Sequence, residues 1–184
     1  MIKNLPGTTI EMTVSNAAVA KELLDNAFIC GGLMMNQVAR LTGLEPYMIQ
    51  NWVKRGFVSP PQKKLYTERQ FCRIVIINML RDVLQIEKIS GLLSYINGRL
   101  DDESDDIIDD SQLYFYFIAA VCEIKEPVIE EKTTERCIEK VVSDFEEPFP
   151  GAKKRLVKVL SVMLNAHLAS HLRRKADEIL NTLD

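Results

Sequence analysis

The feature that most restricts the fold of this chain is a small residue followed four positions later by a glycine. Both are set among regularly spaced apolar residues. Ala39 falls near the end of an apolar-periodic stretch, and Gly43 follows where the periodicity breaks. A close helix crossing needs a small side chain, and a tight turn needs a residue that tolerates positive φ. The stretch therefore predicts a helix over about 34–41, a turn at 42–44 and a second helix. The residues expected to lock the two helices together are Val38, Leu44, Ile49 and Trp52.

The second predicted helix presents a polar outer edge. Pro46 suits its first position, where no N–H is needed, and Gly56 suits its end, after the basic pair Lys54 and Arg55. Gln and Asn can bond adenine edges in a major groove, while Arg and Lys reach guanine or phosphate. A DNA-reading helix at about 45–55 is one interpretation, and an ordinary helical hairpin with a polar face is the other. Helical spacing points these residues outward: Glu45, Tyr47, Gln50, Asn51, Lys54 and Arg55.

The segment that follows Gly56 first interrupts and then restarts the helical pattern. Residues 57–66 contain Pro60-Pro61 and cannot be helical. Thr67 and Gln70 have the spacing of a capping box, which predicts a helix from there to about Leu84. Another helix is expected over 86–96, ending at Asn97-Gly98.

Helical periodicity also dominates the remainder, so we expect an all-α protein with a C-terminal helical bundle. The run DDESDDIIDD is expected to be an acidic linker or exposed loop, because close like charges repel one another in a packed arrangement. The predicted organisation has four parts: an N-terminal extension (1–33), the helix-turn-helix domain (34–100), the acidic linker (101–110) and a C-terminal domain for dimerisation or sensing (111–184). The extension is expected to be irregular at 1–15, with a short helix at about 15–28. The C-terminal domain is expected to contain helices at 112–124, 133–145 and 152–182.

Charge is distributed unevenly along the chain. The formal net charge is −3, which by itself argues against a nucleic-acid partner. Residues 34–73, however, hold seven basic side chains against two acidic ones, whereas residues 101–147 hold sixteen acids and four bases. We call 34–73 the basic island. It is either a local footprint for phosphate or a chance cluster on solvated helix faces.

The sequence offers little for catalysis or metal binding. His167 and His171 lack the companion residues of a helical zinc site, and we expect them in a core or interface. The acidic run lacks the glycine and spacing of a calcium-binding loop. Four scattered cysteines form no CxxC pair, no secretory signal is visible, and no apolar run approaches the roughly 20 residues of a membrane helix. We expect a cytoplasmic protein that is not an enzyme and uses no cofactor or metal.

Three consecutive stretches resemble the helix-turn-helix and wing of the MerR-like regulators: GFVSPP, then QKKLY, then the capped helix at TERQF. Residues 37–96 are still more similar to a bacterial MerR-like family of unassigned role, with its "NWVKRGFVSPP…KKLYT" core and "LLSYINGRLDDESDD"-like sequel. The resemblance implies a winged helix-turn-helix at 34–100 with a short wing at about 57–66. It assigns base reading to Tyr47, Gln50, Asn51 and Lys54, and phosphate contacts to Arg55, Lys63, Lys64 and Tyr66.

Two functions are compatible with these observations. The first is a sequence-specific transcriptional regulator that binds double-stranded DNA as a homodimer and responds to an unidentified small-molecule effector. MerR-like proteins dimerise through a long helix, and residues 152–182 could serve as one. The wing is shorter here than in that family, which weakens its expected contact. The alternative is a helical protein-interaction adaptor that keeps the fold without binding DNA, as the net negative charge favours.

Overall fold

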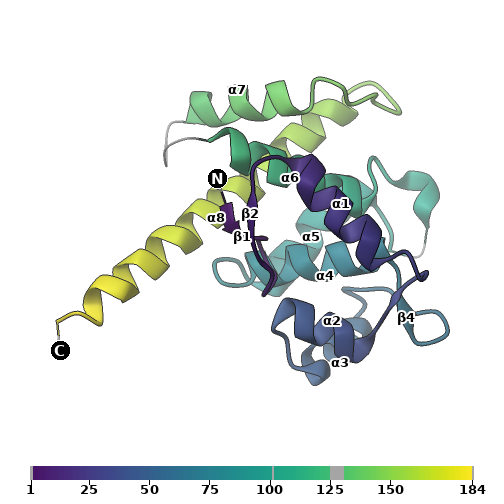
Figure 1. Ribbon diagram of the computed structural model, residues 1–184. Coiled ribbons are helices and arrows are strands. Elements are labelled where there is room, and N and C mark those ends of the chain that lie inside the picture. Colours follow the sequence, from purple (N-terminus) through teal and green to yellow (C-terminus); the bar gives the residue numbers. More distant parts are fainter. Residues whose placement is uncertain (1, 101, 125–130, 184) are drawn as a thin grey trace.

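The computed structural model describes residues 2–100, 102–124 and 131–183, and most of them are helical (Figure 1). This confirms a mostly helical fold, but four short strands correct the expectation of an all-α chain. Some positions of the predicted segments lie outside the described residues: residue 1, residue 101 of the acidic run, residues 125–130 and residue 184. The helices are α1 (Ala17–Ala27), α2 (Met35–Thr42), α3 (Pro46–Lys54), α4 (Glu68–Leu80), α5 (Ile86–Asn97), α6 (Asp110–Glu123), α7 (Glu131–Val141) and α8 (Ala152–Leu180), with a short 3₁₀ turn, η1 (Glu103–Asp105).

The N-terminal residues form a hairpin, so the prediction of an irregular segment at 1–15 is wrong. Strand β1 (Ile2–Asn4) pairs antiparallel with β2 (Glu11–Val14). Leu5 is fully buried, and the Tyr114 hydroxyl of α6 donates a 2.6 Å hydrogen bond to the Pro6 carbonyl. Gly7 lies so close to α4 that an added Cβ would fall 2.5 Å from the Val75 carbonyl oxygen. The hairpin is therefore part of the core.

Helices α4 and α6 form the centre of the molecule. Nearly every residue from Phe71 to Leu80 is buried, which is the pattern of a helix enclosed on all sides. Helix α6 lies against α4, α1 and α8, and it contributes Tyr114 and Phe117 to the core. Helices α2 and α3 and strand β4 (Leu65–Tyr66) lie at one end of this arrangement (Figure 1). Helices α2 and α3, which carry the predicted DNA-reading edge, are thus attached to a densely buried centre.

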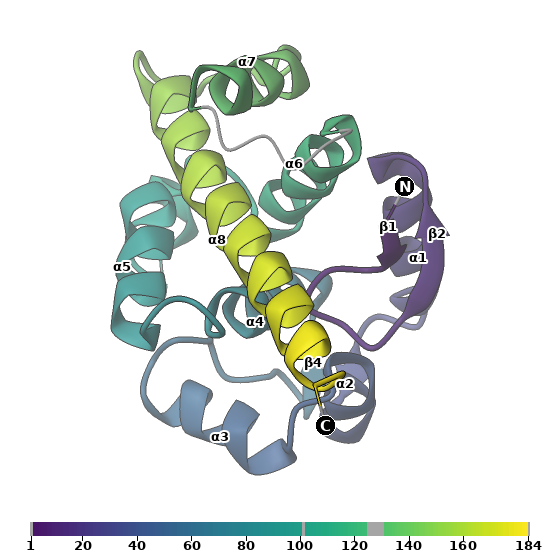
Figure 2. The same ribbon diagram turned by 90° about the vertical axis from the view of Figure 1, so that its left-hand side faces the viewer.

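Helix α8 is long and only partly covered. Its N-terminal portion packs against α5, α6 and α7, which flank it in Figure 2. Beyond Ser170 every described residue is exposed, and this end projects from the body (Figure 1). Among the described residues, no helix combines the length and the apolar character needed to cross a membrane.

The acidic run packs against the body of the protein over part of its length. Ile107 and Ile108 are 5% and 4% exposed, and the Ile107 N–H donates to the Ile96 carbonyl at 3.2 Å. Asp110 is also buried, as the first residue of α6. The prediction of an exposed loop is therefore wrong at these positions, because the two isoleucines and basic partners on α4 compensate for charge repulsion.

Candidate nucleic-acid interface

Helices α2 and α3 are joined by the short turn that the sequence predicted. Helix α2 ends at Gly43, whose φ of +69° is the left-handed conformation that glycine adopts without steric cost. Pro46 opens α3. The Thr42 hydroxyl donates to the Val38 carbonyl at 2.7 Å and so closes the last turn of α2. All the residues expected to lock the helices, together with the small residue at the crossing, are buried: Val38, Ala39, Leu44, Ile49 and Trp52.

The N-terminal hairpin supports this turn from outside. The Thr9 hydroxyl donates to the Arg40 carbonyl at 2.8 Å, and the Thr9 N–H donates to the Leu41 carbonyl at the same distance. Asn78 of α4 donates from its amide to the carbonyls of Gly7 and Thr42, both at 2.9 Å. These contacts fix α2 relative to α4. Sequence reasoning missed them because the partners lie 31 to 71 residues apart.

The outer edge of α3 is open to solvent. Tyr47 is 68% exposed, and Gln50, Asn51 and Lys54 are exposed beside it. Within the residues that the structure describes, no hydrogen bond or ion pair occupies these four side chains. Two amide side chains and a lysine on one exposed helix edge form a surface that can donate and accept hydrogen bonds toward a partner. The carboxylates of Asp106 and Asp110 in the acidic run form ion pairs with Arg69 and Arg73 of α4.

Arg55, immediately after α3, already has an anionic partner. Its guanidinium lies 2.6 Å from a carboxylate oxygen of Glu87 on α5 and 4.6 Å from the ring centroid of Phe57. The pKa of Glu87 is lowered, first by a hydrogen bond from its own backbone N–H and then by Arg55. Both side chains are about half exposed, so the pair is weak. A phosphate could replace Glu87 as the partner of Arg55.

The predicted wing is a minimal hairpin. Strand β3 (Leu33–Met34) pairs antiparallel with β4, and the Leu65 N–H donates to the Gln62 carbonyl at 2.8 Å. The two residues between Gln62 and Leu65 are Lys63 and Lys64, whose φ angles are +48° and +68°. Two positive φ values define a type I′ turn, which prefers Asn-Gly. Left-handed backbone costs about 1–2 kcal/mol for an ordinary residue, so this tip holds two exposed lysines in a strained conformation.

Tyr66 does not belong to the exposed surface. It is 1% exposed, and its hydroxyl donates to the Met35 sulfur at 3.8 Å. The phosphate contact implied for Tyr66 is therefore corrected: its ring anchors the wing to α2. Burial alone raises its pKa.

We expect the strain at the wing tip to be measurable. The double substitution Lys63→Asn and Lys64→Gly should raise the free energy of unfolding by about 1 kcal/mol, since Asn and Gly tolerate positive φ. Urea denaturation followed by circular dichroism measures this. The control, Lys63→Gln with Lys64→Gln, removes the same charges and keeps the strain, so its stability should be unchanged. Equal stability of both variants would show that the turn is unstrained.

Two members of the basic island are turned inward rather than displayed. Arg73 is buried, and its guanidinium lies 3.1 Å from a carboxylate oxygen of Asp110. Arg69 is 22% exposed and forms an ion pair with Asp106, with Asp109 3.7 Å away. The positive charge around α3 is therefore smaller than the composition of residues 34–73 indicates.

The buried ion pair also braces the segment that leads into the wing. Arg73 donates from Nε to the Phe57 carbonyl at 2.7 Å, and Gln70 donates to the carbonyls of Ser59 and Pro60, both at 3.0 Å. Burial raises the pKa of Asp110 against the lowering effect of Arg73. Sequence reasoning recognised Gln70 only as a helix cap and Arg73 only as a surface charge.

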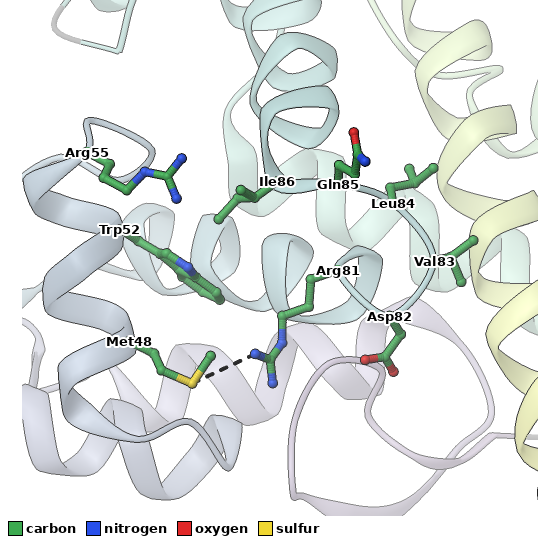
Figure 3. A pocket seen from close by; sticks show the side chains of 9 residues that line it. All are labelled: Met48, Trp52, Arg55, Arg81, Asp82, Val83, Leu84, Gln85 and Ile86. Atoms are coloured by element: carbon green, nitrogen blue, oxygen red, sulfur yellow. Dashed lines mark hydrogen bonds between the residues drawn. The ribbon is translucent and has the colours of Figure 1, made fainter.

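Two hollows flank α3. The larger, about 670 Å³, lies between α3 and the connection from α4 to α5 (Figure 3). Trp52 and Arg55 line it from α3, and Arg81 lies 3.8 Å from the Met48 sulfur. The smaller, about 430 Å³, lies between α3, the start of α2 and the wing. Neither lies among the C-terminal helices, the part of the chain predicted to serve for dimerisation or sensing.

The histidines lie away from this surface. The ring of His167 packs edge-on against Phe117, with centroids 5.5 Å apart, and burial lowers its pKa to about 4. Among the described residues, no group of three or more His, Cys, Asp or Glu side chains could hold a metal ion.

Comparison with known proteins gives two matches. Residues 31–117 match the family model described as "Domain of unknown function (DUF1836)". This segment, just under half of the chain, runs from the wing strand β3 through α2–α5 and the acidic run into α6. The chain is also 24% identical over 156 residues to the "Uncharacterized protein YkrK" of Bacillus subtilis (strain 168), covering 79% of this chain and 67% of that protein. No solved structure matches the chain.

Proposed function

We propose that this chain is a sequence-specific transcriptional regulator that binds double-stranded DNA and acts in the cytoplasm without catalysis. The observation that carries the proposal is the open edge of α3 next to the two lysines of the wing tip. Gln50 and Asn51 are exposed amides, and neither has a partner among the residues that the structure describes. They would read base edges together with Tyr47 and Lys54, while Lys63 and Lys64 would hold the backbone. Arg55 would join them by exchanging Glu87 for a phosphate.

The number of cations sets the expected salt dependence. Three phosphate contacts per subunit, six in the dimer, predict that the logarithm of the binding constant falls with the logarithm of salt concentration with a slope of about −5. This is modest for a DNA-binding protein. It agrees with the net charge of −3 and with the inward position of Arg69 and Arg73. Specificity in this proposal therefore depends mainly on base contacts by α3.

The proposed regulator is a homodimer joined by the projecting end of α8. Leu172 and Ile179 are 43% and 57% exposed and fall on one face of the helix, with Ala176 between them. The basic run 173–175 is followed by the acidic pair 177–178. An antiparallel pair centred on residue 176 would place each basic run opposite the acidic pair of the other copy. A two-fold dimer of this kind would read two half-sites.

Disrupting this apolar stripe should separate the subunits. We expect Leu172→Glu with Ile179→Glu to convert a dimer to a monomer in sedimentation velocity, because two buried apolar contacts per copy would become charged. Ile29→Glu, which changes an 80% exposed residue elsewhere, is the control and should stay dimeric. A wild-type chain that sediments as a monomer at every concentration would contradict this part of the proposal.

The helical adaptor is the second candidate function. The negative net charge and the partial neutralisation of the basic island favour it. Selection from fragmented genomic DNA separates the two. The tagged protein is mixed with the fragments, and the retained fragments are sequenced. The regulator is expected to retain fragments that share a sequence with two-fold symmetry, and the adaptor is expected to retain no more DNA than the tag alone.

The hollow of Figure 3 offers a route from a small-molecule effector to α3. It contains Trp52, the only tryptophan of the chain, and it borders Arg55. A molecule lodged there would press on the inner side of α3 and compete for the Arg55 guanidinium. Tryptophan fluorescence would report such binding directly.

A further inference from the structure

We infer that the groove between α3 and the wing receives the 5-methyl group of a thymine, so that it sets a preference for A·T pairs beside Gln50. This inference rests on the proposed function. The groove holds about 430 Å³, enough for a base edge with its methyl group. It opens on the same side of α3 as the proposed reading edge, because Gln50 itself lines it.

The chemistry of the groove is mainly apolar. Two adjacent methionines, Met34 at the end of β3 and Met35 at the start of α2, line it together with Pro46 and the anchored ring of Tyr66. Met34 is 51% exposed, and the pairing of β3 with β4 positions its backbone beside Leu65. A thioether is polarizable and adapts its shape to an apolar partner. The groove thus offers an apolar lining in the middle of a polar surface.

Only one base carries an apolar group into the major groove. Thymine presents its C5-methyl there, whereas the other base edges present hydrogen-bond donors and acceptors. Gln50 stands on one wall of the groove, and its amide can pair with adenine N6 and N7. Lys64, which also lines the groove from the wing tip, can reach a phosphate. The apolar lining, the amide of Gln50 and the ammonium group of Lys64 together fit a thymine with an adenine next to it.

The test removes the methyl group from the DNA. A duplex obtained by genomic selection is compared with duplexes in which single thymines are replaced by deoxyuridine, which pairs identically but lacks the methyl. One buried methyl predicts about fourfold weaker binding at one thymine position in each half-site and no change at the others. If every deoxyuridine duplex binds as tightly as the thymine duplex, the inference is overturned while sequence-specific binding stands.

A matched pair of variants links the effect to the groove. Met34→Gln should keep the overall affinity within a few-fold and reduce the thymine-to-deoxyuridine ratio to below about twofold. Val83→Gln, at a residue that is 41% exposed outside the groove, should leave the ratio unchanged. A full ratio in Met34→Gln would overturn the inference. Absence of sequence-specific binding by the wild type would overturn the proposed function and the inference together.

Discussion

Replacing Gln50, Asn51 and Lys54 together by alanine is expected to abolish sequence preference while the protein remains folded. A pair of good hydrogen bonds from one side chain to one base discriminates by about 1–3 kcal/mol, so loss of two amides removes most of the discrimination. All three side chains are exposed, so their removal should change the free energy of unfolding by about 0.5 kcal/mol or less.

The measurement is a fluorescence titration of the variant with a selected duplex and with a scrambled duplex of equal length. The scrambled duplex should bind only slightly more weakly to the variant than to the wild type, because Lys63 and Lys64 still hold the backbone. Substitution of Lys158 and Asn165 on α8, which are also exposed, removes the same single positive charge and should keep the preference. Unchanged preference in the α3 variant would show that another surface reads the DNA.

Arg73→Met is expected to cost about 3–5 kcal/mol of stability, a large share of the 5–15 kcal/mol typical of a whole domain. The substitution leaves the Asp110 carboxylate, 1% exposed, without its 3.1 Å guanidinium partner. Of the partners in the described part of the chain, the Asn97 amide at 3.1 Å and the more distant Arg69 would remain. The Phe57 carbonyl would also lose its donor, so the segment leading into the wing should loosen.

Urea denaturation of Arg73→Met tests this, and adding Asp110→Asn to the variant should recover much of the loss by removing the uncompensated charge. The deficit should also depend on pH. Burial raises the pKa of Asp110 in the folded chain, and loss of Arg73 raises it further. Because the folded-state pKa is raised, the contribution of Asp110 to stability is fully present below its unfolded-state pKa, about 3.9, and is lost as the pH rises through its folded-state pKa. The deficit of Arg73→Met should therefore increase with pH.

The exposed pair Lys21 and Asp25 is the matched control for this prediction. The two are 58% and 49% exposed and lie four residues apart on α1. Lys21→Ala should cost far less stability than Arg73→Met, since solvent screens such pairs. If Arg73→Met cost no more than Lys21→Ala, the bracing role assigned to Arg73 would be wrong.

Local signals in the sequence predicted much of the helical framework. The crossing residues of α2 and α3, the turn at Gly43 and the start of α4 after Thr67 all depend on neighbours within a few positions, and the structure confirms them. The exposed positions of Gln50, Asn51 and Lys54 follow from the helical period alone. The helical period does not identify the partner that these side chains bind, so DNA binding stays a prediction.

Long-range contacts explain what the sequence did not reveal. Asp110 and Arg73 are 37 positions apart, and Arg55 and Glu87 are 32 apart, so neither pairing leaves a local pattern. The N-terminal hairpin was missed because its strands are short and owe their burial to α4 and α6. Tyr66 is a residue whose amphipathic side chain suits either a surface or an anchor, and only the contact with Met35 decides between them.

The central claim is that the edge of α3 distinguishes one DNA sequence from another. The most direct measurement is a competition titration at fixed salt, in which unlabelled scrambled DNA displaces a labelled selected duplex from the wild-type protein. We predict that at least about a thousandfold excess of competitor over selected DNA is needed for half displacement. Half displacement at equal concentrations of the two duplexes would contradict the claim.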